Sequence, residues 1–455
     1  MTKENKMGTV PVFKLIVTMS LPAMFSMLVQ SLYNIVDSMF VARIGEEALT
    51  AVSLAFPIQA LIIAVAVGTG IGINSLVSRR LGEKRNEEAS KAATHGIILG
   101  VFSWIIFAIF GLGFSKTFIE AFTTNPKVIQ MGYNYLSIVT IFSFGVFIEI
   151  NLEKTLQATG NMIYPMIFQL IGAITNIILD PIFIFGLFGF PKMGISGAAV
   201  ATVIGQILSM IYAIFIVFRK DHAIHITFRN FKISKTTIKD IYGVGFPSIV
   251  MQSIGSVLIM GLNSILITFS EAAVAVLGVY YKLQSFVFMP VFGLTHGVMP
   301  IMGYNFGAKN KKRLLSALKL GSIIALTIMA LGTILFMVFP KELLMIFNAS
   351  EEMLDIGIKA LRTISVCFIP AALGIMFSTL FQAVGSGVKS LIVSVLRQLV
   401  IILPGAYLLS KIGLDYVWFA FPLAELVALL VSVIMFRKLY KEKLKNLSEE
   451  VFSET

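Results

Sequence analysis

The sequence has little charge and almost no cysteine. Only 13% of its 455 residues are charged, whereas a soluble domain carries roughly 25%. Its single cysteine, Cys367, excludes a disulfide framework and any cysteine-based metal site. Its four histidines lack metal-ligand spacing, and no cluster of His, Asp or Ser groups marks a catalytic centre. These absences argue against a soluble protein, a disulfide scaffold or an enzyme, and we expect no cofactor.

Apolar residues make up 57% of the chain and form long unbroken runs. A helix that crosses a bilayer needs ~20 mostly apolar residues. Only helices and closed barrels satisfy their backbone hydrogen bonds in lipid, and barrel strands alternate rather than run unbroken. The sequence therefore predicts an all-α polytopic membrane protein with 12 transmembrane helices, whose first partner is the lipid bilayer.

Basic residues give the chain a net charge of +12, but they gather in alternate connections between the apolar runs. Under the positive-inside rule these connections face the cytoplasm. The basic tract is thus a topology signal and not a nucleic-acid site. We expect a multi-pass protein of the cell inner (plasma) membrane with both termini cytoplasmic. The basic connections occupy residues 79–91, 219–239, 309–313 and 437–445.

The two halves of the chain repeat with an offset of 225 residues. LPAMFSMLVQS at Leu21–Ser31 aligns with FPSIVMQSIGS at Phe246–Ser256, and QATG at Gln157–Gly160 aligns with QAVG at Gln382–Gly385. The pairing weakens after the fifth helix, and the FRK motifs at 218–220 and 436–438 predict a shorter second half. Glycines also pair, as Gly68, Gly72 and Gly82 with Gly293, Gly297 and Gly307.

A parallel repeat of six helices predicts two six-helix bundles related by a pseudo-two-fold axis along the membrane normal. Because both bundles lie in one chain, we expect a monomer. The expected parts are an N-lobe at 1–218, a cytoplasmic linker at 219–239, a C-lobe at 240–437 and a cytoplasmic tail at 438–455.

Four acids lie in the apolar runs of the first half only. Ionisable groups within a membrane usually pair or line a cavity. Because the repeat is kept and the acids are not, they serve more than the shared fold. We therefore expect the ion chemistry in the first lobe. The acids Asp37, Glu149, Glu153 and Asp180 correspond to Leu262, Gly374, Ser378 and Gly405 in the second half.

An oxygen-rich cluster is predicted around Asp180. Asn176 precedes it by four residues and shares its helix face. Pro181 frees a backbone carbonyl near Asn176. Asp37 and the Thr202 hydroxyl add further oxygens. Such a group could bind Na⁺, or a buried carboxylate could take a proton. The alternative is a set of hydrogen bonds that only hold the helices together.

A second set of side chains is predicted to contact substrate. Glu149 and Glu153 are one helical turn apart, and acids that face a cavity attract cations. Glu153 could instead neutralise Lys154, which follows it. One face of the first helix adds a polar stripe that ends at Asp37, although core packing is the alternative for its methionine. The stripe consists of Met27, Gln30, Tyr33 and Asn34.

The second half has its own charged residues within the apolar runs. A base such as Lys282 or Arg397 would need an acidic partner there, and Glu425 is the acid available. We expect a structural ion pair between helices.

Five segments together resemble the MATE (multidrug and toxic compound extrusion) family. They are NIVDSMF, ARIGEEALTAVSLAFP, LQATGN, TNIILDPIFIFG and GISGAAVATVIGQ, and the resemblance spans essentially the whole chain. Glu153, two residues after Asn151, and Asp180 on the next span look most like the MepA-like branch of bacterial exporters.

The resemblance implies an antiporter that exports cationic, amphipathic drugs, and so confers antibiotic resistance, in exchange for Na⁺ or H⁺ by alternating access. It assigns ion coupling to Asp37, Asn176, Asp180, Ala198 and Thr202, and the fourth-helix acid to Glu153. The rivals are a flippase for lipid-linked sugars, which would have a more basic cavity, a membrane enzyme and a passive channel.

Overall fold

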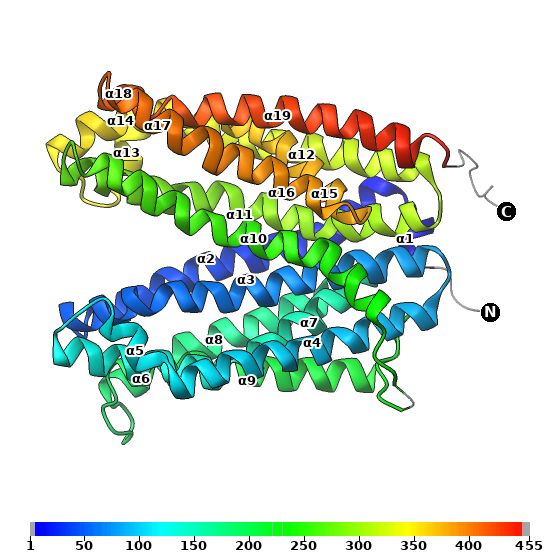
Figure 1. Cartoon of the computed structure of the whole chain (residues 1–455), viewed down its shortest axis with the longest axis horizontal. Helices are drawn as coiled ribbons and strands as arrows, with labels where there is room; N and C mark the ends of the chain where they lie inside the picture. The colour runs from blue at the N-terminus through cyan, green and yellow to red at the C-terminus, as the bar shows by residue number, and fades with distance from the viewer. Residues whose placement is uncertain (1–4, 221, 230, 448–455) are drawn as a thin grey trace. The chain divides into compact units, whose positions relative to one another are not determined.

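The computed structural model describes residues 5–220, 222–229 and 231–447, and nearly all of them are helical (Figure 1). No strand occurs within these ranges. The helices are α1 (Lys6–Thr9), α2 (Val12–Ala42), α3 (Glu46–Gly82), α4 (Asn86–Gly113), α5 (Ser115–Glu120), α6 (Pro126–Ile141), α7 (Phe144–Ala158), α8 (Ile163–Phe185), α9 (Ile195–Arg219), α10 (Lys235–Leu266), α11 (Glu271–Gly307), α12 (Lys311–Val338), α13 (Pro340–Met345), α14 (Glu351–Ser365), α15 (Phe368–Ala383), α16 (Gly387–Val395), the π-helix η1 (Leu396–Ile402), α17 (Leu403–Ser410), α18 (Leu414–Val417), α19 (Ala420–Leu439) and the π-helix η2 (Tyr440–Leu444).

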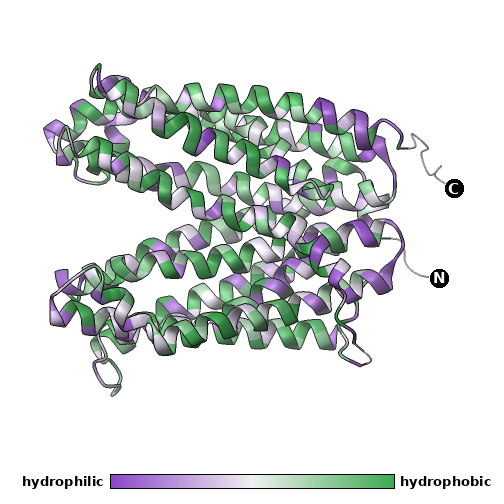
Figure 2. Cartoon of the chain, viewed as in Figure 1, coloured by the Kyte–Doolittle hydropathy of each residue, from purple (hydrophilic) through white to green (hydrophobic). Residues whose placement is uncertain are grey.

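Twelve spans are present once two bent helices are counted. Ten spans in the described part of the chain are long and apolar enough to cross a membrane. Two more are broken, between α6 and α7 with a bend of 44° and between α14 and α15 with a bend of 47°. Along the long helices apolar residues predominate, and hydrophilic ones gather toward the ends (Figure 2). The prediction of an all-α, twelve-helix membrane protein is confirmed.

Element boundaries repeat the 225-residue offset. Both ends of α3 lie 225 residues before the ends of α11, and the same holds for α4 with α12 and for α5 with α13. The offset also holds for the sixth spans, since α9 covers Ile195–Arg219 while α19 and η2 together cover Ala420–Leu444. The expectation of a shorter second half was wrong. Its FRK motif does not end the helix, which continues past the basic residues as a π-helix.

Contacts divide the chain into two compact units, which we call the N unit (Phe25–Ile249) and the C unit (Met1–Met24 with Val250–Thr455). Two helices, α2 and α10, therefore belong to both units. Each changes unit two residues after an internal proline, Pro22 in α2 and Pro247 in α10. Proline removes a backbone hydrogen bond, so a helix can bend there. The lobes expected at 1–218 and 240–437 stay a proposal.

Paired glycines explain how each unit holds the beginning of a helix from the other half of the sequence. In the N unit, Gly68 of α3 lies against the backbone of Ile249 in α10. In the C unit, Gly293 of α11 lies against the backbone of Met24 in α2. These two contacts are related by the repeat offset. The glycines that the sequence pairs are thus positions where two helix backbones meet without room for a Cβ.

Candidate functional site

Two acids from different helices meet within the N unit. Asp37 lies in α2 and Asp180 in α8, and their carboxyl groups are within hydrogen-bonding contact. Asp180 is completely buried, whereas Asp37 is half-buried. Both helices are apolar enough to cross a membrane. A charge in such a helix is costly unless it is paired or faces water, so this contact is the first candidate for a site.

Asn176 links Asp180 to the neighbouring helix α9. With its amide oriented to suit its neighbours, its Nδ2 donates to Asp180 Oδ2 at 2.7 Å. Its amide oxygen accepts from the Oγ1 and backbone N of Thr202, both at 3.0 Å. The structure thus brings together Asp37, Asn176, Asp180 and Thr202, as their sequence pattern suggests. We call these four residues the acid cluster.

Close packing of α8 on α9 makes this bridge short. Both helices lie side by side in Figure 1, and small residues of α9 face α8. At Gly197 an added Cβ would lie 2.6 Å from the backbone carbonyl of Phe183. Ala198, which carries no polar side chain, is 1% exposed and lies in an apolar core with Ile184 and Ile195. Ala198 therefore supports the acid cluster through packing.

Two tyrosines complete the polar surroundings of the acid cluster. The Tyr33 hydroxyl is hydrogen-bonded to the side chain of Thr202. Tyr135 of α6 lies near Asp37, and its hydroxyl donates to Gln59 Oε1 of α3 at 3.1 Å. Sequence reasoning missed Tyr135 and Gln59. Gln59 recurs as Gln284 in the second half and so resembled a residue of the shared fold, and no motif marks Tyr135.

The rest of the predicted stripe on α2 is only partly covered. Met27 and Gln30 are half-buried, and Asn34 is exposed. The Tyr33 side chain joins the acid cluster, as described above. Met27, Gln30 and Asn34 keep their role as substrate contacts only as a proposal.

Glu153 lies in a buried polar cluster of its own. It is 3% exposed, and its Oε1 lies 3.0 Å from Lys154 Nζ. It accepts hydrogen bonds from Gln157 Nε2 at 2.7 Å and from Gln169 Nε2 at 3.0 Å. Glu149, also buried, is hydrogen-bonded to Ser209 of α9. The ion pair with Lys154, one of the two interpretations of Glu153, is therefore present, and drug binding by either acid stays a proposal.

The C unit contains the ion pair expected between its charged residues. Arg397 Nη1 of η1 donates to Glu425 Oε1 of α19 at 2.9 Å. The partner predicted for Arg397 is confirmed. Lys282 of α11 instead places its ammonium 5.8 Å from the ring centroid of Phe347.

A family model describes both halves of this arrangement. The model for MatE matches residues 22–182 and again residues 247–408, two segments whose starts are 225 residues apart. The chain belongs to the MATE family. Members of this family are transporters, which agrees with the absence of a recognisable catalytic motif.

Relatives of this MATE chain are multidrug exporters by name. It is 26% identical to the multidrug export protein MepA of Staphylococcus haemolyticus over 426 residues, covering 93% of each chain. It is 25% identical to MepA of Staphylococcus aureus (strain MRSA252) over 432 residues, again with 93% of each chain covered.

Solved MATE structures share the fold throughout. One, described as an outward-facing multidrug resistance MATE family transporter of the MOP superfamily, is 30% identical with a TM-score of 0.92 over 98% of this chain and 100% of its own. Another, from Pyrococcus furiosus, is also 30% identical, with a TM-score of 0.91 over 98% and 99%. It is described as having a binding pocket of reverse polarity that suggests a different function.

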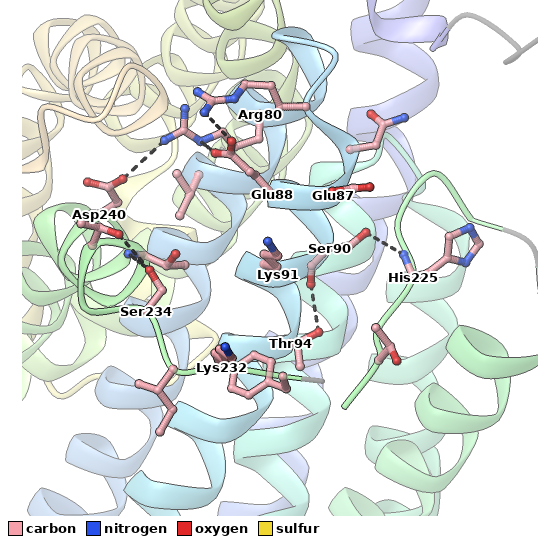
Figure 3. Close-up of a pocket in the computed structure, with 18 of the residues that line it drawn as sticks. Arg80, Glu87, Glu88, Ser90, Lys91, Thr94, His225, Lys232, Ser234 and Asp240 are labelled. Carbon is pink, nitrogen blue, oxygen red and sulfur yellow. Dashed lines mark hydrogen bonds and ion pairs between the residues drawn. The ribbon is translucent and has the colours of Figure 1, made fainter. Parts of the chain in front are cut away.

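A further cavity, of ≈ 1070 Å³, lies in the N unit between the beginning of α4 and the linker (Figure 3). Arg80 spans it, paired with Glu88 at 3.3 Å and with Asp240 at 3.6 Å. Its lining mixes both signs of charge with hydroxyl groups, including Lys91, Lys232, Ser90 and Thr94. In this MATE protein the cavity is thus bounded by the chain segment that joins the two halves.

His95 fastens this linker to α4. The ring is 2% exposed, and its Nδ1 lies 2.7 Å from the carbonyl oxygen of Lys91. Because a carbonyl only accepts, Nδ1 carries the proton and Nε2 is free to accept from Ser234 N at 2.9 Å. The ring also contacts Phe231, with centroids 4.7 Å apart.

We expect His95→Phe to loosen the linker. The aromatic shape remains, but the Ser234 N–H loses its acceptor, a loss of about 1 kcal/mol for one hydrogen bond. Trypsin cleavage at the exposed bases Arg229 and Lys232 should become roughly fivefold faster, measured on gels of purified protein. His225→Ala is the control, because His225 contacts Ser90 Oγ only through its backbone N. Equal cleavage of both variants would contradict the role of His95.

Proposed function

We propose that this protein is a secondary multidrug antiporter. It exports cationic, amphipathic molecules by alternating access and is driven by Na⁺ or H⁺ that binds at the acid cluster. The support is the direct contact between the carboxyl groups of Asp37 and Asp180. Two like charges in contact inside an apolar span require a proton or a cation between them. The equivalent positions, Leu262 and Gly405, show that the repeated fold does not need such a pair.

Each residue of the acid cluster has a distinct task in this mechanism. Asp37 is half-buried and so receives the ion, while the buried Asp180 shares it. Asn176 and Thr202 provide amide and hydroxyl oxygens for Na⁺, or fix the carboxyl of Asp180 when the ion is a proton. Because Asp37 lies on α2 beyond Pro22, ion binding can change the bend of a helix that belongs to both units.

Coupling needs no direct contact between ion and drug. If the ion stabilises one state and the drug the other by a few kcal/mol, each drives the release of its competitor. The acids of the N unit favour a cationic drug, with Tyr33, Met27, Gln30 and Asn34 as contacts in addition to Glu149 and Glu153. No cofactor enters this cycle.

The coupling ion is identified by imposing one gradient at a time. In proteoliposomes of the purified protein, either an inward Na⁺ gradient at equal pH or a pH gradient without Na⁺ should drive ethidium accumulation. Asn176→Ala should weaken Na⁺ dependence by roughly tenfold if Na⁺ binds its amide oxygen, and should change proton-driven transport less. Accumulation that ignores both gradients would contradict antiport and indicate a passive channel.

A flippase for lipid-linked sugars is the second candidate. The reverse polarity described for the Pyrococcus furiosus relative shows that the sign of charge matters in this superfamily. The acid cluster here favours cations. Loss of lipid-linked precursor export, together with absent dye efflux, would support the flippase. We also propose that the protein functions as a monomer in the plasma membrane with cytoplasmic termini, supported by its internal duplication and its basic connections.

A further inference from the structure

The ion pair of the C unit lies in an unusual piece of helix. Arg397 belongs to η1, a seven-residue π-helix inside the span Gly387–Ser410. A π-helix inside an α-helix is rare and frequently marks a functional site. The partner, Glu425, lies in α19. The side chain of Arg397 is 28% exposed and that of Glu425 11% exposed, so the base is the more accessible of the two.

The fold does not require this pair. At the equivalent positions the first half has Gly172 and Val200, in the continuous α-helices α8 and α9. Replacing a buried ion pair by apolar residues is often neutral or stabilising, so the pair is poor support for a purely structural role. As with the acid cluster, charge has been placed in one half of a repeated fold. Here the pair joins the fifth and sixth spans, as Asn176 and Thr202 do in the N unit.

Arg397 keeps unused hydrogen-bonding capacity. A guanidinium has five N–H donors, and among the described residues only Nη1 has a partner, Glu425. A charged group that is partly exposed within a span faces water rather than lipid, because lipid exposure is costly. Close by, the buried hydroxyl of Tyr281 has no hydrogen-bond partner among the described residues and lies within electrostatic range of Arg397. A donor fork and an unpaired hydroxyl together suit an oxyanion.

We propose that Arg397 and Tyr281 form a site for the carboxylate or sulfonate of a zwitterionic, amphipathic substrate. The free edge of the guanidinium binds the oxyanion in bidentate fashion, and Tyr281 donates a further hydrogen bond. Glu425 holds the guanidinium in place and lowers its attraction for anions. This inference rests on the proposed export function and refines its substrate class. The C unit would read the anionic end of a molecule, while the acids of the N unit suit its cationic end.

Two dyes that differ by one ester test the proposal. Rhodamine 110 carries a free carboxylate, and rhodamine 123 is its methyl ester with the same ring system. Fluorescence anisotropy with the purified full chain in detergent gives the affinity for each dye. We expect Arg397→Gln to weaken rhodamine 110 binding at least ~10-fold and to leave rhodamine 123 unchanged, because one charge-assisted bidentate contact is lost. Tyr281→Phe should act in the same direction with a smaller effect.

Variants of the acid separate recognition from structure. Glu425→Gln should strengthen rhodamine 110 binding, since Arg397 keeps its full charge. A structural pair predicts that both single substitutions weaken both dyes alike, which would overturn the proposal. The double variant Arg397→Glu with Glu425→Arg keeps an ion pair between the same helices and guards against a folding failure. It should bind rhodamine 123 normally and rhodamine 110 more weakly, and wild-type affinity for both dyes would overturn the proposal.

The wild-type protein distinguishes this inference from the proposed function. Binding of rhodamine 123 without rhodamine 110 would overturn the oxyanion site and leave drug export standing. Binding of neither dye would remove the support from both.

Discussion

Cells that express Asp37→Asn are expected to lose at least ~10-fold of their ethidium efflux. Asparagine keeps the size of the side chain and some hydrogen bonds to Asp180, but it cannot carry the charge that a coupling ion neutralises. Without that change of charge the two states of the carrier are no longer driven apart. The measurement is the loss of ethidium fluorescence from preloaded cells that lack their own exporters, normalised to the amount of protein in the membrane.

The same substitution at a neighbouring acid serves as control. Glu120→Gln removes a charge from an exposed side chain of the N unit, whose only described ion pair, to Lys116, is long at 3.8 Å. It should leave efflux unchanged. Asp180→Asn should resemble Asp37→Asn, and the double variant should be no worse than either single one, because the two carboxyl groups act as a unit. Full efflux by Asp37→Asn would remove Asp37 from the mechanism.

A single added methyl group at Gly293 is expected to destabilise the C unit. In Gly293→Ala the new Cβ would lie 2.5 Å from Met24 Cα and 2.6 Å from Met24 N. Backbone atoms cannot turn aside as a flexible side chain can, so α2 and α11 must separate, at a cost of about 1–3 kcal/mol. The variant should melt at a lower temperature in detergent, and less of it should elute as a single species in size-exclusion chromatography.

Gly278 is a matched control in the same helix. No atom lies within 4 Å of a Cβ added there. Gly278→Ala should therefore be neutral or stabilising by about 0.5–1 kcal/mol, because alanine favours helix more than glycine. The repeat adds a second comparison, since Gly68→Ala should disturb the N unit against Ile249 as Gly293→Ala disturbs the C unit. Equal stability of Gly278→Ala and Gly293→Ala would show that this helix contact is not tight.

Much of the fold could be predicted because membrane helices are encoded locally. A long apolar run has few alternatives to a helix in lipid, and a constant 225-residue offset passes each prediction from one half to the other. The FRK motif misled because it marks charge near a membrane edge, whereas the helix itself continues through η2. The bends between α6 and α7 and between α14 and α15 have no proline or glycine at the break, so no local signal announces them.

The acid cluster shows which parts of a site can be predicted. Asp37 and Asp180 stand out because charge is rare and costly in an apolar span, and Asn176 is tied to Asp180 by helical spacing. Tyr135 and Gln59 carry no such signal, since a neutral polar residue is tolerated in many places. The partners of Glu153 also needed coordinates, because Gln169 lies on the next helix and its distance depends on packing.

The sequence by itself determined the helices, their number, the duplication and the acids confined to one half, because each depends on composition and spacing along the chain. Only the tertiary structure decided that α2 and α10 each belong to two units, that paired glycines are contacts between helix backbones, and that Arg397 meets Glu425 across two helices. These features depend on which helix faces lie together. That choice is made by packing between residues far apart in the chain, which no local pattern records.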